Sequence, residues 1–372
     1  MLQKQEATLR GRISRGGRFD QVFRKSGNFV IPLLKNPKAQ YLQSVKEMHQ
    51  SDHRTPTVAV VIPAYRARCT VLDVIQRVGP AVSLIYVIDD GCPEETGRVV
   101  ERDCSDSRVQ VLKNKLNLGV GAAMKRGYEA ALNDGADIIV KIDADGQCRP
   151  ELIPELIYLI CVGASDYVKG NRLLSPESLK TMPKNRLFGN LVLSFATKIS
   201  SGYWHLMDPT NGLTAISANI WTLLPAEKIS DRFFFESDML FRLGLLGARV
   251  HDFSMVAVYG EERSSLVIKD IIWPFLWGLA KNSAKRIVYK YFVQDFNIGS
   301  LYLISGLSSL VLGGLLGISY WAEGVSSDQY ASPGRVMLAG LPVLLGFQLL
   351  FNFLAFDMAG DNGRRIHFYR SK

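Results

Sequence analysis

The chain has 372 residues, of which 47% are hydrophobic and 21% are charged, so it is long enough for one or two folded domains with a substantial core. Its formal net charge of +9 suits a nucleic acid, an anionic membrane or a phosphorylated substrate and does not choose among them. The five cysteines form no CxxC pair, which argues against a zinc site or a disulfide framework and favours a reducing compartment.

Residues 1–55 are basic, with eleven lysines and arginines against four acids. Near an anionic lipid surface each such cation contributes about 1 kcal/mol of attraction. We interpret the segment as a basic N-terminal arm that either contacts lipid or is disordered.

From residue 57 onward, short β-branched runs alternate with helical patterns. Strands are expected in "TVAVVIPAY" (57–65), "SLIYVIDDG" (83–91), "RVQVLKN" (108–114) and "ADIIVKIDADG" (136–146), and helices in "TVLDVIQRVG" (70–79) and "GVGAAMKRGYEAALNDG" (119–135). This alternation predicts an α/β domain with a mostly parallel, doubly wound sheet, whose ligands bind beyond the carboxyl ends of the strands.

Acidic residues end two of these strands. Asp89 and Asp90 follow one apolar run, and Asp143 and Asp145 follow another at 138–140. Residues i and i+2 of an extended chain point the same way, so Asp143 and Asp145 can face one hard cation and the phosphates that it carries. For this D-x-D motif taken alone, a turn with solvated acids is the alternative.

The glycine-rich stretch "NLGVGAAMKRG" is not followed by a Walker lysine, and the first strand ends in Pro63-Ala64-Tyr65 where a Rossmann fingerprint needs glycines. These features disfavour a dinucleotide dehydrogenase. Because helix-turn-helix and zinc-finger spacings are also absent from the sequence, we assign the positive charge to membrane and phosphate contacts and expect no nucleic-acid partner.

Two segments, 296–322 and 336–356, contain no charged residue, and each is long enough to cross a bilayer. Lysines and arginines flank the pair on both outer sides, so the positive-inside rule predicts a hairpin whose preceding domain is cytoplasmic. Two buried core helices are the alternative.

The stretch before this hairpin mixes aromatic, aliphatic and basic residues. We expect one or two amphipathic helices among the lipid headgroups, interrupted at Pro274 and anchored by Trp273, Trp277, Tyr289 and Tyr291. A helix packed on the main domain is the alternative.

In this order, "VVIPAY", "VIDDG", "NLGVGAAMKRGYEAA", "KIDADGQCRPELI", "KGNR", "DPTNGLTAIS", "FFFESDMLFRL" and "VYGEERSSL" resemble the motifs of family-two glycosyltransferases of the GT-A fold. The resemblance is to the polyprenyl-phosphate branch that includes dolichol-phosphate mannose synthase, and it covers residues 57–360. It implies a Rossmann-like, mostly parallel GT-A sheet with flanking helices. It also implies an inverting, metal-dependent transfer of a sugar from a UDP- or GDP-sugar to undecaprenyl or dolichyl phosphate.

The resemblance further implies which residues bind the donor. The base pocket is lined by Pro63, Ala64 and Tyr65, and the ribose side is held by Asp89 and Asp90. Mg²⁺ or Mn²⁺ is bound against the diphosphate by Asp143 and Asp145, with Gln147 nearby. The chain departs from the family motif P-x-Y-N-E, because Arg66 and Ala67 follow the tyrosine. The contact that the motif's acid makes to the nucleotide is therefore absent or replaced.

Further candidates follow from residue type. A departing diphosphate needs positive charge, which we expect from a metal on Asp145 and from Arg263. Arg172 and Arg186 are candidates for gripping an acceptor phosphate, with ordinary surface charge as the alternative. Asp238 is the candidate base or acceptor-orienting residue, preferred over Glu236. In "DPTNG", Asp208 and Asn211 either line the site or form a turn.

We therefore expect five segments: the basic arm (1–55), a GT-A nucleotide-sugar catalytic domain (56–262), interfacial amphipathic helices (263–295), two transmembrane helices (296–358) and a basic cytoplasmic tail (359–372). The expected setting is a membrane, most simply a bacterial plasma membrane, with the catalytic domain cytoplasmic. A glycosyltransferase with a polysaccharide or other lipid acceptor and a non-catalytic nucleotide-binding membrane scaffold remain alternatives. The sugar, the base and the existence of a homo-oligomer stay open.

Overall fold

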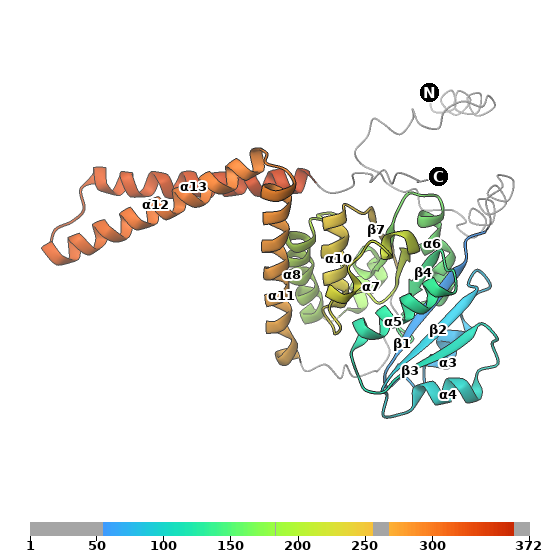
Figure 1. Ribbon diagram of the computed structural model, residues 1–372. Coiled ribbons are helices and arrows are strands. Elements are labelled where there is room, and N and C mark those ends of the chain that lie inside the picture. The colour runs from blue at the N-terminus through green and yellow to red at the C-terminus, as the bar shows by residue number, and fades with distance from the viewer. Residues whose placement is uncertain (1–54, 183, 256–267, 361–372) are drawn as a thin grey trace, which may run out of the picture. The chain divides into compact units, whose positions relative to one another are not determined.

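The computed structural model describes residues 55–182, 184–255 and 268–360. The expected basic arm, Arg263 and nearly all of the expected basic tail lie outside the described residues. Figure 1 shows how the described strands and helices follow one another.

In the described part, seven strands form one sheet in the order β3-β2-β1-β4-β6-β5-β7. Parallel pairs join β1 to β2 and β4, β2 to β3, and β5 to β7, whereas β6 runs antiparallel between β4 and β5. The expected α/β fold with a mostly parallel sheet is confirmed. The strands are β1 Val58–Ala64, β2 Leu84–Asp90, β3 Val109–Asn114, β4 Ile138–Lys141, β5 Tyr167–Asn171, β6 Thr214–Ser217 and β7 Val250–Ser254.

The strand order reverses at β1. The chain adds β2 and then β3 on one side of β1, and β4 on the other. Ala64 pairs with Asp89 of β2, and Val61 pairs with Lys141 of β4. The chain therefore leaves three neighbouring strands at one edge, and such a switch point opens a crevice in which α/β proteins bind ligands.

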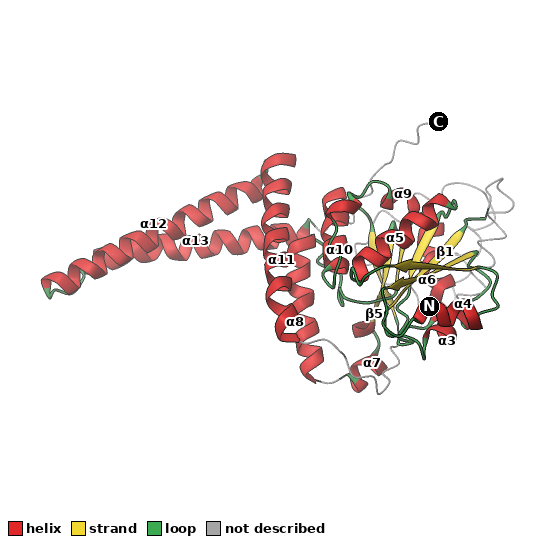
Figure 2. Cartoon of the chain, turned by 60° about the horizontal axis from the view of Figure 1, so that its bottom comes forward, coloured by secondary structure: helices red, strands yellow, loops and turns green. Residues whose placement is uncertain are grey.

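Helices cover both faces of the sheet (Figure 2). In β1, Val60 and Ile62 enter one hydrophobic layer, and Ala59 and Val61 enter the other, because alternate residues of a strand point to opposite faces. The first layer is covered by α3 Val71–Gln76, α4 Thr96–Asp103 and α6 Ile153–Cys161, and the second by α5 Val120–Asn133, α9 Ala218–Trp221 and α10 Phe235–Leu246. Two further α-helices of the described residues 55–255 are α7 Pro176–Thr181 and α8 Lys184–Ser201.

The helix α11, Ile268–Val288, packs against α8 and α10 and continues into a π-helical turn, Tyr289–Gln294. Pro274 lies inside α11, so the expected interruption there is wrong. A proline removes one backbone hydrogen bond from a helix. The packing of α11 on α8 and α10 compensates for that lost bond.

The aromatic residues of this region fall into two groups. Trp273 and Trp277 are 75% and 73% exposed, and Tyr289 is also exposed, as interface anchors require. Tyr291 is instead buried, so its expected anchoring role is wrong. One face of α11 thus packs on the domain while the other remains uncovered, which combines the two alternatives drawn from the sequence.

Two long helices, α12 Ile298–Ser327 and α13 Pro333–Ala359, lie side by side (Figure 1). Each is long and apolar enough to cross a membrane, with a mean hydropathy of 1.9 in its most apolar stretch. Only 11% of that stretch is buried, which argues against two core helices. Gly306 and Gly346 let the backbones approach, since a Cβ on Gly346 would lie 2.9 Å from the carbonyl oxygen of Gly306.

Two helical glycines give opposite predictions for the same substitution. A Cβ on Gly127 of α5 would lie 2.3 Å from Cγ1 of Val61 in the sheet, whereas a Cβ on Gly189 of α8 would meet nothing within 4 Å. We expect Gly127→Ala to lower the free energy of unfolding by about 1–3 kcal/mol through overpacking, and Gly189→Ala to leave it unchanged or raise it by up to about 1 kcal/mol. Thermal unfolding of both variants in detergent checks this, and equal effects would contradict the close packing of α5.

Candidate functional site

The carboxyl ends of β1, β2 and β4 bring the expected donor-binding residues to one edge of the sheet. Ala64, the last residue of β1, pairs with Asp89. Because Lys141 at the end of β4 pairs with Val61, the chain beyond β4 passes beside Pro63. The structure therefore gathers the end of β1, the Asp89-Asp90 pair and the D-x-D motif.

Asp143 lies just beyond β4, before a turn, and Asp145 lies in that turn. Ala144 between them is buried, and both acids are partly exposed. Oδ1 of Asp145 accepts a 2.9 Å hydrogen bond from the backbone N–H of Gln147, and Gly146 takes the left-handed backbone conformation that this turn needs. The turn is therefore compatible with the expected metal binding by the D-x-D motif, because it leaves both carboxylates partly open to solvent.

Lys141 is a buried cation behind the D-x-D motif. Its side chain is 1% exposed, and its Nζ lies 2.6 Å from Oδ1 of Asp143 and 3.1 Å from Oε1 of Glu236. Burial by itself would lower the pKa of Lys141, but the two facing carboxylates outweigh it and raise that pKa. Burial raises the pKa of Glu236, against the opposing charge of Lys141. The lysine therefore stays charged and fixes one oxygen of Asp143.

Asp143 and Asp145 suit a divalent metal ion. A Cβ on Gly212 would lie 1.7 Å from Oδ2 of Asp143, so only glycine leaves room for this carboxylate. No group of three or more histidine, cysteine or acidic side chains that could hold a metal occurs among the described residues. Mg²⁺ characteristically takes one or two carboxylates and completes its shell with water and phosphate oxygens. The two aspartates fit an ion that shares a diphosphate, not one enclosed by protein.

Asp89 and Asp90 are buried, and their carboxylates hold backbone. Asp89 accepts hydrogen bonds from the N–H groups of Cys92 and Gly97 at 2.8 and 2.7 Å, and Asp90 accepts one from Gly119 at 2.7 Å. These bonds anchor the segments that enter α4 and α5. A carboxylate has about four lone-pair positions, so the expected contact with a ribose is compatible with this anchoring and remains a prediction.

The departure from the family motif lies at the end of β1. Tyr65 is 42% exposed, and the guanidinium carbon of Arg66 lies 5.5 Å from the centre of its ring. Arg66 has a φ of +54°, an uncommon conformation for a residue other than glycine. Ala67 is buried. The position of the motif's acid is thus occupied by a buried methyl group, and the exposed charge beside Tyr65 is positive.

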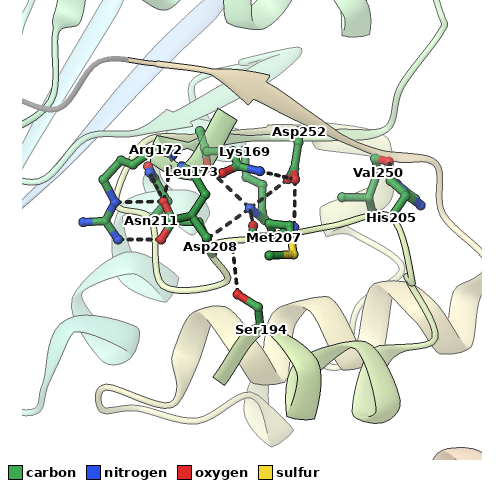
Figure 3. A network of polar contacts seen from close by, with 12 residues as sticks. Lys169, Arg172, Leu173, Ser194, His205, Met207, Asp208, Asn211, Val250 and Asp252 are labelled. Atoms are coloured by element: carbon green, nitrogen blue, oxygen red, sulfur yellow. Dashed lines mark hydrogen bonds and ion pairs between the residues drawn. The ribbon is translucent and has the colours of Figure 1, made fainter. Parts of the chain in front are cut away.

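A buried ion pair holds the loop 208–212 (Figure 3). Nε and Nη2 of Arg172 lie 2.8 and 2.5 Å from the two carboxylate oxygens of Asp208, to which Asn211 also donates a hydrogen bond at 3.0 Å. Ser194 of α8 accepts a hydrogen bond from the backbone N–H of Asp208 at 3.1 Å. Since the guanidinium fork is committed to Asp208, the structure favours a loop-holding role for Arg172 over the expected contact with an acceptor phosphate. That loop also carries the glycine that packs against Asp143.

A second buried cation ties the same loop to the sheet. Nζ of Lys169 lies 2.8 Å from Oδ1 of Asp252 and donates to the carbonyl oxygen of Asp208 at 3.0 Å. Oδ2 of Asp252 accepts hydrogen bonds from Asn171 and from the N–H of Met207, at 2.6 and 2.8 Å (Figure 3). The sequence analysis missed Lys169 and Asp252, although a lysine in a buried strand indicates a buried partner.

Asp238 is held by structural partners. Its Oδ2 accepts hydrogen bonds from the N–H of Ser230 at 3.0 Å and from Arg242 at 3.2 Å, and its Oδ1 accepts one from Asn282 of α11 at 2.9 Å. Glu236 faces Lys141 instead, since residues two apart on a helix lie on different faces. The structure therefore favours Glu236 over Asp238 as the acid that α10 contributes to the site.

Arg186 lies in the first turn of α8. Its side chain is outside the described part of the chain, as is the whole of Arg263. The expected contacts of these two arginines with phosphate remain predictions.

The Arg172–Asp208 pair predicts a pH-dependent stability. Burial would raise the pKa of Asp208, but Arg172 outweighs it and lowers that pKa from 3.8 to about 2. A carboxyl whose pKa is lower in the folded state stabilises the fold above its unfolded pKa, and the contribution, here about 2 kcal/mol, is lost as pH falls from about 4 to about 2.

We therefore expect Asp208→Asn to lower the melting temperature at pH 7, because it leaves a buried arginine unpaired at a cost of about 3–5 kcal/mol. The gap from the wild-type protein should be constant above pH 5 and narrow below pH 4. Thermal unfolding in detergent across this range measures it, and a gap independent of pH would contradict the assigned pairing.

Comparison with known proteins identifies the family of the chain. The family model described as glycosyl transferase family 2 matches residues 59–222. Over 190 residues the chain is 30% identical to the UDP-N-acetylglucosamine–dolichyl-phosphate N-acetylglucosaminyltransferase of Methanococcus voltae, covering 47% of this chain and 75% of that protein. Over 232 residues it is 30% identical to the undecaprenyl-phosphate mannosyltransferase of Micrococcus luteus, covering 60% and 94%.

Among solved structures, glucosyl-3-phosphoglycerate synthase from Mycobacterium tuberculosis, in complex with Mn²⁺, UDP and glucosyl-3-phosphoglycerate, aligns with a TM-score of 0.47 at 20% identity, over 62% of this chain and 80% of that one. Mannosyl-3-phosphoglycerate synthase from Rubrobacter xylanophilus aligns with a TM-score of 0.48 at 16% identity, over 70% and 86%. The family assignment rests on the sequence relatives: the chain belongs to glycosyl transferase family 2 and is a glycosyltransferase.

Proposed function

We propose that this glycosyltransferase moves one sugar, with inversion, from a UDP- or GDP-sugar to a polyprenyl phosphate such as undecaprenyl or dolichyl phosphate, at the cytoplasmic face of a membrane. The observation that carries the proposal is that one chain holds both an acidic switch-point edge and two helices long and apolar enough to span a bilayer. The names of the Methanococcus and Micrococcus relatives, which specify dolichyl and undecaprenyl phosphate, support the choice of acceptor.

In this proposal Asp143 and Asp145 hold Mg²⁺ or Mn²⁺. A bound divalent ion neutralises the charge that develops on a departing diphosphate. Lys141 keeps Asp143 oriented, and the backbone N–H of Gln147 orients Asp145. With Glu236, these side chains carry a net charge of −2 when all are ionised, which a divalent cation balances.

A phosphate acceptor needs little activation. Its second pKa is about 6, so its oxygen is already largely ionised at pH 7 and no strong general base is required. This agrees with an Asp238 that is engaged by structural partners. Arg186 and Arg263 are our candidates for gripping the acceptor phosphate and the diphosphate. We reassign Arg172 from acceptor binding to positioning the loop 208–212.

Two neighbouring helices support contact with a lipid surface. Phe188, Leu191, Val192 and Phe195 of α8 are all exposed, at the spacing that places them on one helix face. The helix α8 packs against α11, which exposes two tryptophans. An exposed apolar patch of this kind marks an interaction site, and tryptophan favours the membrane interface. We propose that α8 and α11 rest on the bilayer beside the hairpin.

The metal assignment predicts the effect of Asp145→Asn. Turnover should fall at least about 10²-fold, because changes outside a metal's first shell already cost about 10–100-fold. Asp73→Asn, which alters an exposed acid on α3, should leave turnover unchanged. Unfolding curves of both variants should match that of the wild-type protein. Near-normal turnover of Asp145→Asn with Mn²⁺ would count against the assignment.

The lipid contact predicts a selective effect of Phe188→Glu combined with Phe195→Glu. Turnover with a long-chain polyprenyl phosphate in lipid nanodiscs should fall at least about tenfold, since the loss of even one buried phenylalanine is worth about 1.5–3 kcal/mol, while turnover with a short, water-soluble prenyl phosphate should change little. Leu223→Glu, an exposed apolar residue outside α8 and α11, is the matched control. Equal losses with both acceptors would refute contact of α8 with lipid.

The reaction itself is tested by release of UDP or GDP from nucleotide-sugars by the purified full-length protein, with and without polyprenyl phosphate. The proposal predicts release that depends on the lipid, and a mass spectrum of the lipid gives the sugar. Release that is indifferent to the lipid would point to another acceptor. No release with any donor would favour a nucleotide-binding scaffold.

A further inference from the structure

A carboxylate near the end of α13 makes five close contacts that the proposed reaction does not explain. Asp357 is 1% exposed. Its oxygens lie 2.9 and 2.7 Å from the two terminal nitrogens of Arg286, and they accept hydrogen bonds from Tyr291 at 2.7 Å and Trp204 at 3.1 Å. Nζ of Lys290 is 3.3 Å away. We call these five residues the Asp357 cluster.

The cluster joins three segments that are far apart in the chain: α13, α11 with the turn that follows it, and the residues just after α8. Arg286 belongs to α11, Lys290 and Tyr291 belong to the π-helical turn that follows it, and Trp204 follows α8. Nε of Arg286 also donates a hydrogen bond of 2.8 Å to the carbonyl oxygen of Ile199 in α8. One carboxylate on α13 is therefore bound by α11, by the turn that precedes the hairpin and by Trp204, which lies just after α8.

Spanning a bilayer does not require this charge. The stretch 336–356 of α13 is uncharged, and a lone acid at its end would be more stable in water than among apolar side chains. Burying it demands compensation, which the bidentate Arg286 fork and two neutral donors provide. Such a cluster is costly to disturb by removing a single partner, so it resists displacement of the helix end.

The contacts continue from α8 toward the site. Ser194 of α8 accepts the hydrogen bond from the N–H of Asp208, whose loop carries Gly212 against Asp143. The helix that Arg286 grips is thus the helix that supports this loop.

We infer that Asp357 is a positioning residue, which docks the end of the second membrane helix on α8 and α11 and so sets where a lipid-bound acceptor meets the carboxyl edge of the sheet. The docking stands on the contacts alone. Its consequence for the acceptor rests on the proposed function. Asp357 touches neither the donor-binding edge nor Asp143 through any contact in the described residues, and it takes no part in bond making.

The docking is tested by hydrogen exchange on the full-length protein in nanodiscs. Asp357→Asn keeps the shape of the side chain and removes its charge. Amides in 198–206 and 282–294 should exchange about 10²-fold faster, as expected when one partner of a buried pair is lost. Glu323→Gln is the matched control, because it breaks a 2.9 Å ion pair with Arg335 that is about half exposed, and exchange should stay within about fivefold. Unchanged exchange in Asp357→Asn would overturn the docking.

A double replacement guards against a general loss of folding. Arg286→Met with Asp357→Leu removes both charges and fills the space with apolar groups, so exchange should return to within about tenfold of the wild-type rate. If the double variant loses as much protection as the single variants Arg286→Met and Asp357→Leu combined, the residues do not act as a pair and the inference fails.

The positioning role is tested by kinetics. In Asp357→Asn the KM for polyprenyl phosphate should rise about tenfold, while the KM for the nucleotide-sugar stays unchanged. Altered exchange with an unaltered acceptor KM would confine Asp357 to stability and overturn the positioning role. If the wild-type protein shows no lipid-dependent turnover, the proposed function fails, and the exchange measurements still decide whether the helix is docked.

Discussion

The geometry of the candidate site depends on the ion contacts of Lys141, a buried cation held between Asp143 and Glu236. A charged lysine inside a sheet is tolerated only when carboxylates face it, and here the same contact fixes one metal-binding candidate at the end of β4. Gly212 closes the other side of that carboxylate, because no side chain fits there. The position of Asp143 is therefore set by the interior of the domain and not by the solvent-exposed turn.

The same device recurs around the site. Arg172 and Lys169 are buried cations that hold the loop 208–212, and Arg286 is a buried cation that holds the end of α13. In each case a carboxylate distant in sequence completes the pair. Such pairs contribute little net stability but strongly disfavour rearrangement, since separating them leaves a charge unpaired in the interior. Fixed geometry of this kind suits the proposed alignment of a nucleotide-sugar with an acceptor anchored in lipid.

Local patterns were enough to predict the order of the early strands and the two apolar helices, because β-branched runs and long uncharged stretches have few other outcomes. Long-range pairing was not visible. Asp238 was preferred to Glu236 from the sequence. Which of the two acids faces Lys141 depends on how α10 packs on the sheet, and the sequence does not show that packing. Arg172 was a candidate for gripping an acceptor phosphate, with ordinary surface charge as the alternative, and its buried partner Asp208, 36 residues later in the chain, was not visible. The apolar face of α8 was overlooked although its spacing is plain in the sequence.

We expect the acids beyond β4 to bind a divalent ion against the diphosphate of a nucleotide-sugar. Titration calorimetry of UDP- and GDP-sugars into the full-length protein, with and without Mn²⁺, tests it most directly. We expect Mn²⁺ to strengthen the binding of at least one donor by about tenfold or more, equivalent to about 1.4 kcal/mol. This gain should disappear in Asp143→Asn. Donor affinity that is the same with and without Mn²⁺ would contradict this expectation.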